Sequence, residues 1–152
     1  MTLEQLSEVA AARGIEIDDV PMRELRAVSF PGGCIAMDRR KFASDAEYKC
    51  ELAHEIGHCE TGAFYNIHAR NDVKCCCEYR ANRHAAELLV PLDELRHALR
   101  YGLLPFHTLA RIFDVTLEFI VMVFEVYEHE MCAPVHRGVT WLTARRHARR
   151  IY

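Results

Sequence analysis

Residues 44–58 read SDAEYKCELAHEIGH, and this stretch decides how the rest of the chain is interpreted. Ser44 followed three positions later by Glu47 is typical of a capping box, in which the serine oxygen accepts a hydrogen bond from a free backbone N–H of the first helical turn. We therefore expect a helix to begin at Asp45 and to run to about residue 59.

This helix carries the pattern His54-Glu55-x-x-His58, with two histidines four residues apart. Four residues advance an α-helix by about 400° and about 6 Å, so both imidazoles project from one face and can bind one tetrahedral metal ion. Glu55 lies about 100° around the helix from His54, beside the metal but off the ligand face. Its carboxylate is therefore placed to take a proton from a water molecule bound to the metal.

A second predicted helix, between about residues 72 and 90 and ended by Pro91, supplies a third ligand. Glu78 follows His58 by 20 positions, and Asn82 lies one turn further along the same helix face. If the two helices are antiparallel neighbours, the Glu78 carboxylate completes a His-His-Glu site and leaves a fourth position for water, as in catalytic zinc sites. Asn82 is then placed to accept the second N–H of a ligating imidazole and to orient its ring.

The chain before the first of these helices predicts a small sheet. A short helix is expected over residues 2–13. The runs 26–30 and 34–37, separated by Pro31-Gly32-Gly33, are typical of a β-hairpin with its turn residues in place. A small N-terminal sheet or hairpin is therefore expected before the active-site helices.

The chain after Pro91 is predicted to continue as helices. The expected helical stretches are 92–100, 105–113 and 116–127. With 152 residues, the chain is close to the size of one average domain. We therefore predict a single α+β domain over residues 1–152, with the C-terminal helices of 92–128 and a basic tail at 137–152 as an appendage.

Composition and charge exclude several classes of protein. Hydrophobic residues make up 51% of the chain and charged residues 27%, so it has enough apolar material to fold. The strongly apolar run 119–124 is far shorter than the roughly 20 residues that a membrane helix needs. The N-terminus carries acids where a secretory signal carries basic residues, so we expect a cytoplasmic protein. The seven cysteines, an odd number, do not suggest a disulfide framework.

The two motifs resemble the ImmA/IrrE family of zinc metallopeptidases, which are common in bacteria and their mobile elements. The resemblance rests on HEIGH at residues 54–58 and on EYRANRHAAELLVP at residues 78–91, and it extends over about residues 15–128. It implies a zincin-like α+β fold that binds one Zn²⁺ per chain. The implied site consists of the zinc ligands His54, His58 and Glu78 and the catalytic base Glu55.

By this resemblance the protein is a zinc endopeptidase that cleaves a protein substrate, typically a phage-type repressor or another DNA-binding regulator of transcription. Glu55 would accept a proton from the attacking water and pass it to the leaving amine. The residue that stabilises the oxyanion is left open, with Tyr65, His68 and Tyr79 as candidates because they are near in sequence. We expect the run 34–37 to be an edge strand that aligns an extended substrate by strand addition.

Two other functions are compatible with parts of the sequence. A zinc-stabilised module could bind a regulator without cleaving it, although such a module has no need of the base Glu55. Residues 109–124 resemble a helix-turn-helix, and the arginines of the tail raise DNA as a partner. However, residues 117–124 are apolar and acidic where a recognition helix offers Arg, Lys, Asn or Gln to the bases. We therefore expect this helix to be part of the core, with no direct nucleic-acid binding. The oligomeric state is left open.

His84 and the run Cys75-Cys76-Cys77 suggest further metal ligands, but their spacing argues against this. His84 lies about 240° around the helix from Glu78, so it faces away from the site. Adjacent helical residues diverge, so three consecutive thiols do not converge on one ion. We expect His84 to be a packed or surface residue and the cysteines to be buried or incidental.

Overall fold

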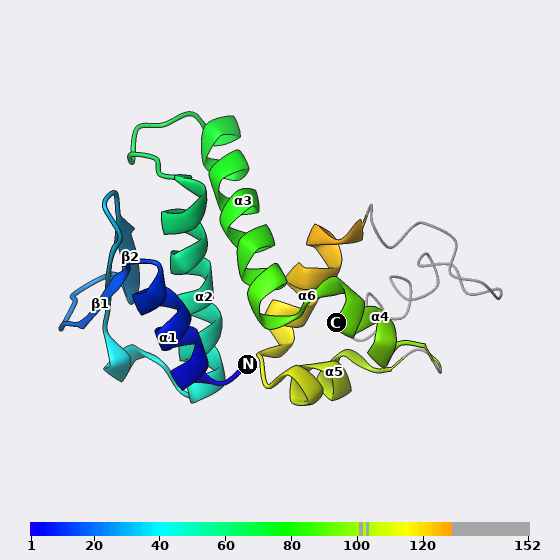
Figure 1. Cartoon of the computed structure of the whole chain (residues 1–152). Coiled ribbons are helices and arrows are strands. Elements are labelled where there is room, and N and C mark those ends of the chain that lie inside the picture. Colours follow the sequence, from blue (N-terminus) through cyan, green and yellow to red (C-terminus); the bar gives the residue numbers. More distant parts are fainter. Residues whose placement is uncertain (101, 103, 129–152) are drawn as a thin grey trace.

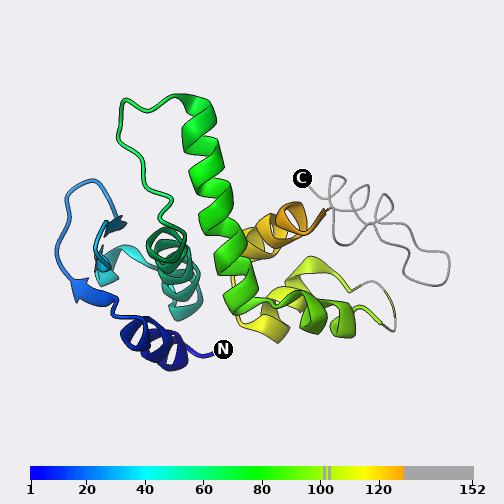
Figure 2. The same cartoon turned by 45° about the horizontal axis from the view of Figure 1, so that its top comes forward.

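The computed structural model describes residues 1–100, 102 and 104–128. Its helices are α1 (Leu3–Ala12), α2 (Asp45–Thr61), α3 (Asn71–Leu89), α4 (Leu92–Ala98), α5 (Phe106–Phe113) and α6 (Leu117–Val126), with a short 3-10 helix, η1 (Arg39–Lys41). Its strands are β1 (Glu16–Asp19), β2 (Ala27–Phe30) and β3 (Cys34–Met37). The fold is α+β, as predicted. The sheet and α1 lie on one side of α2, α3 lies on its other side, and α4–α6 lie beyond α3 (Figures 1 and 2).

The predicted hairpin is present, but a third strand joins it. Strands β2 and β3 pair antiparallel, and β1 adds to the other side of β3 as a parallel strand, which gives the order β1-β3-β2. The prediction that residues 34–37 form an edge strand is therefore wrong. Ile35 and Met37 of β3 are fully buried, as expected for a central strand, whereas β1 reads Glu-Ile-Asp-Asp and shows little apolar pattern. The free edges of the sheet belong to β1 and β2.

The start of α2 follows the predicted cap with one difference. The Ser44 hydroxyl accepts a hydrogen bond from the backbone N–H of Glu47 at 3.1 Å. The Glu47 carboxylate accepts from the N–H of Ala43 at 2.8 Å, one residue before the position that a capping box uses. At its other end, α2 stops at Gly62, whose left-handed φ of 60° turns the chain away.

Helices α2 and α3 pack against each other over a large part of their length. Their faces meet at small residues, Gly57 on α2 and the fully buried Ala81 on α3. A continuous cluster of buried side chains extends from Leu6 in α1 through Leu52 in α2 to Ile120 in α6. The core of the described chain therefore surrounds α2 and α3 and holds their relative position.

Helix α6 packs against α3 and α5 through its apolar face. Its buried residues are Phe119, Ile120, Val123 and Val126. This confirms the prediction that the second helix of the apparent helix-turn-helix belongs to the core. The basic tail at 137–152 lies outside the described residues, so the single-domain organisation over 1–152 stays a prediction. None of the helices described here has the length and apolar character needed to span a membrane.

Candidate metal centre

Three side chains from α2 and α3 converge at one point. The Nε2 atoms of His54 and His58 lie 3.0 Å apart. The Glu78 carboxylate reaches both, with Oε2 at 3.2 Å from Nε2 of His54 and Oε1 at 3.5 Å from Nε2 of His58. These ligand atoms all lie within 4.8 Å of one another. The residues that the helix spacing selected are thus brought together from two elements.

The outer nitrogen of each imidazole is held by an oxygen that accepts a hydrogen bond. Nδ1 of His58 lies 2.7 Å from the carbonyl oxygen of Ala63, and Nδ1 of His54 lies 2.8 Å from Oδ1 of Asn82. A carbonyl or amide oxygen only accepts, so each Nδ1 carries the hydrogen. In the neutral rings, Nε2 is then left with its lone pair, which faces the cluster.

As long as both rings are neutral, two lone pairs and a carboxylate therefore face one another with no donor among the three groups, which favours a bound cation. In the metal-free protein a proton on Nε2 of His54 takes the place of the cation, and its hydrogen bond to the Glu78 carboxylate is the main cause that lowers the pKa of Glu78 to about 2. Burial lowers the pKa of His54, but the hydrogen bond to Glu78 and the charges of Glu55 and Glu78 outweigh it and raise that pKa overall. Two imidazoles and one carboxylate are a donor set that Zn²⁺ accepts in its open, catalytic sites.

Glu55 lies on the same helix, next to the first histidine, and its carboxylate is without a partner in the described part of the chain. Only 8% of the residue is exposed. Within residues 1–100, 102 and 104–128, it forms no hydrogen bond and no ion pair. Because no buried side-chain oxygen in this region lacks a partner, the Glu55 oxygens must reach the protein surface. A buried residue with accessible carboxylate oxygens suits a group that exchanges a proton with a bound water.

Comparison with known proteins identifies the family. A family model described as the IrrE N-terminal-like domain (Peptidase M78) matches residues 15–124. The chain belongs to this family. The match spans α2 and α3, and the family supports a metallopeptidase-type function. Searches of curated proteins and of solved structures found no match.

The segment that follows α2 in this Peptidase M78 chain contributes three consecutive residues to the site. Ala63 provides the carbonyl that holds His58. The ring of Phe64 stacks beside the His58 ring, with centroids 6.3 Å apart. The Tyr65 hydroxyl donates a hydrogen bond to Oε1 of Glu78 at 2.5 Å.

The sequence left Tyr65 as one of three candidates and did not indicate Ala63, because a backbone carbonyl has no signature in the residue types. Of the three candidates, only Tyr65 reaches the cluster. Tyr79 lies next to Glu78 in sequence but is 46% exposed and forms no hydrogen bond with the cluster in the part of the chain described here. His68 lies in the exposed connection, where its backbone N–H donates to the side-chain oxygen of Asn66. The structure thus separates Tyr65 from the two other candidates, which nearness in sequence alone could not do.

The other candidate ligands lie outside the centre. Nε2 of His84 lies 3.2 Å from the Arg13 guanidinium, on a different face of α3 from Glu78. Cys75 and Cys76 are exposed, and Cys77 is buried. Among the described residues of this Peptidase M78 chain, His54, His58 and Glu78 form the one group of three or more histidine, cysteine or acidic side chains close enough to hold a metal ion.

Proposed function

We propose that this Peptidase M78 chain is a zinc-dependent endopeptidase in which His54, His58 and Glu78 bind the metal and Glu55 is the general base. The observation that carries the proposal is the convergence of two imidazole lone pairs and one carboxylate, described above. When bound, zinc would polarise the substrate carbonyl and make the attacking water more acidic.

The chain's own residues would perform the remaining tasks. Asn82 and the Ala63 carbonyl hold the two imidazole rings in the tautomer that presents Nε2. The Glu55 carboxylate has no partner in the described chain and is therefore available to accept a proton from water and to return it to the leaving amine. The intact base distinguishes this proposal from that of a module that binds a regulator without cleaving it.

The proposed substrate is a DNA-binding regulator, such as a phage-type repressor, cleaved in the cytoplasm. This part rests on the resemblance of the HEIGH and EYRAN motifs to the ImmA/IrrE family. A folded regulator would be cleaved in a segment that can extend, because strand addition requires an extended backbone.

The free edge of β2 is the best placed to hold such a segment. Strand β2 packs against α2, and the preceding residue, Arg26, donates to Glu47 and Glu51 of α2 at 2.6 Å each. In an antiparallel pair, every second residue directs its backbone N–H and carbonyl at the neighbouring strand, and the residues between direct theirs outward. Arg26 belongs to the first kind, because its carbonyl accepts a hydrogen bond from the N–H of Asp38. The N–H of Ser29 therefore points away from β3, toward the free edge.

The decisive experiment compares Glu55→Gln with His54→Ala. We expect Glu55→Gln to bind zinc as the wild type does and to lose about 100-fold or more of its proteolytic rate. His54→Ala should lose both zinc and proteolysis. Cleavage is measured as new N-termini, by mass spectrometry, in candidate DNA-binding regulators, beginning with any that is encoded next to this gene.

Two outcomes would contradict the proposal. Full-rate cleavage by Glu55→Gln would remove Glu55 as the base. A wild-type protein that binds zinc and the regulator but produces no new N-termini would favour the binding module.

A further inference from the structure

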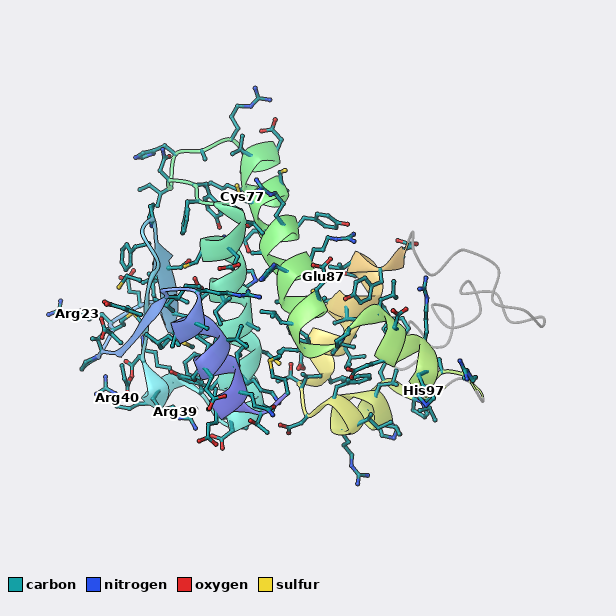
Figure 3. The ribbon with its side chains drawn as sticks, in the orientation of Figure 1. Arg23, Arg39, Arg40, Cys77, Glu87 and His97 are labelled. Atoms are coloured by element: carbon teal, nitrogen blue, oxygen red, sulfur yellow. The ribbon has the colours of Figure 1, made fainter. Side chains whose placement is uncertain are left out.

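The connection between α2 and α3 is held along α3 in a regular way. Side chains of α3 donate to carbonyl oxygens of the last residue of α2 and of the connection that follows it. The donors are three residues apart on α3, and the carbonyls that they reach are also three residues apart. The pairs are Arg80 with Thr61, Cys77 with Phe64 at 3.8 Å, and Lys74 with Ile67 at 2.8 Å. Cys77 lies on α3 close to the end of α2 (Figure 3). Residues 61–67 therefore run antiparallel to α3 in a defined register, which places Tyr65 over Glu78.

Tyr65 holds one of the two oxygens of the Glu78 carboxylate. The Glu78 side chain is 38% exposed, and in the described chain the contacts of its carboxylate are with His54, His58 and Tyr65. Oε2 is the oxygen nearer to His54. The Tyr65 hydroxyl donates to the other oxygen, Oε1, and so fixes the rotation of the carboxylate.

Each member of the His-His-Glu group then has one partner behind it. His54 has Asn82, His58 has the carbonyl of Ala63, and Glu78 has Tyr65. Such partners orient the ligand and reduce the freedom that must be lost when a metal binds. The Tyr65 hydroxyl is engaged by Glu78, so it is not free to donate to a substrate carbonyl in this arrangement.

We propose that Tyr65 is a positioning residue for metal binding, whose hydroxyl holds the Glu78 carboxylate in the orientation that completes the His-His-Glu group. This inference rests on the proposed metal site and deepens it. It assigns to Tyr65 a role in metal affinity, in place of the role in oxyanion stabilisation that its position in the sequence suggested.

The test measures metal affinity in Tyr65→Phe, with Tyr79→Phe as the matched control. Both variants lose one hydroxyl from a tyrosine of similar exposure, 41% for Tyr65 and 46% for Tyr79, but of the two hydroxyls it is that of Tyr65 which donates to the Glu78 carboxylate. Zn²⁺ affinity is obtained by competition with a chromogenic chelator, and Co²⁺ absorption reports the ligand field. We expect Tyr65→Phe to bind Zn²⁺ about 10- to 100-fold more weakly and Tyr79→Phe to match the wild type. Metal-free melting temperatures should be the same in all three proteins.

A double-mutant cycle with Glu78→Ala shows whether Tyr65 acts through Glu78. Once Glu78 is removed, the Tyr65→Phe change should have no further effect on Zn²⁺ or Co²⁺ affinity. An equal effect in both backgrounds would overturn the inference. So would wild-type affinity in Tyr65→Phe, even with slower cleavage, because the hydroxyl would then act on the substrate. If the wild-type protein binds neither ion, the proposed metal site itself fails, and this inference fails with it.

Discussion

The backbone of Ala81 on α3 fills the space that a side chain at Gly57 on α2 would need. A Cβ atom added at Gly57 would lie 2.5 Å from the carbonyl oxygen of Ala81 and 2.9 Å from its Cα atom. Ala81 lies between Glu78 and Asn82 on α3, and both of these reach across to the histidines of α2. The close approach of the helices at Gly57 therefore determines whether the third ligand and the partner of His54 reach their targets.

Replacing Gly57 by alanine should damage the metal site through the helix packing. The added methyl group meets backbone atoms, which cannot rotate away, so the helices must separate. We expect a loss of about 1–3 kcal/mol in the free energy of unfolding, reduced by the better helix propensity of alanine, together with weaker zinc binding. Urea unfolding and zinc titration measure the two effects.

The double variant Gly57→Ala with Ala81→Gly serves as the control. Because the clash involves the carbonyl oxygen and Cα of residue 81, removing the side chain at this position should not restore zinc binding. Full rescue would show that side-chain crowding, and not the approach of the backbones, sets the distance between α2 and α3.

Removing the amide of Asn82 should weaken metal binding without unfolding the protein. Asn82→Ala deletes the oxygen that holds Nδ1 of His54 at 2.8 Å, so the ring is no longer fixed in one tautomer. We expect zinc affinity to fall about 10- to 100-fold. The matched control is His84→Ala on the same helix, whose ring contacts Arg13 away from the centre. Equal losses in both variants would indicate a general effect on α3.

Asp38 should make stability depend on pH in the acid range. Its buried carboxylate accepts hydrogen bonds from the Arg40 side chain and from the N–H of Met22, and these hold its pKa well below the ordinary value. Because the pKa is lowered by folding, its contribution is complete above the ordinary pKa and is lost as the pH falls toward the folded value. Asp38→Asn should therefore melt below the wild type at neutral pH, and the two melting curves should approach each other below about pH 4. A constant difference down to pH 2 would contradict this assignment.

The pairing of Lys49 with Asp114 should be asymmetric in its effect on stability. The Lys49 side chain is only 1% exposed, and its Nζ lies 2.6 Å from Asp114 and 3.1 Å from the carbonyl oxygen of Met1. In Asp114→Asn, the new asparagine tolerates the left-handed φ of 52° at this position, but the buried Lys49 ammonium loses its charged partner. We therefore expect the free energy of unfolding to fall by about 1–3 kcal/mol.

Lys49→Met should cost less, because it leaves behind an Asp114 side chain that is 77% exposed to water. Urea unfolding of both variants measures the difference. A larger loss in Lys49→Met than in Asp114→Asn would show that the ammonium is stabilised mainly by its other contacts.

The parts of the site that sequence predicted well depend on local helix geometry. The spacing of His54 and His58, and that of Glu78 and Asn82, is set by the helical repeat once the helices are recognised. The cap at Ser44 marks α2, and the apolar pattern with the following Pro91 marks α3. The single assumption needed beyond this was that α2 and α3 are neighbours. The core holds them side by side, and the missing side chain at Gly57 lets their backbones approach closely.

The features that sequence did not predict depend on contacts between distant segments. Strand β1 has exposed acids at Glu16, Asp18 and Asp19, and its place in the sheet comes from parallel pairing with β3, which leaves no local pattern. The carbonyl of Ala63 belongs to the backbone, so no residue type marks it. Tyr65 was one of three polar candidates until the register of the connection on α3 was known.

The bonds between α3 and residues 61–67 also restrict how the length of this segment can vary. Deleting one residue before Phe64 would shift every later carbonyl relative to its donor on α3 and would carry Tyr65 past Glu78. An insertion after Ile67, beyond the last of these bonds, would leave the three pairs intact. Tolerance to insertions should therefore change sharply at Ile67, in a segment that has no regular secondary structure to suggest such a boundary.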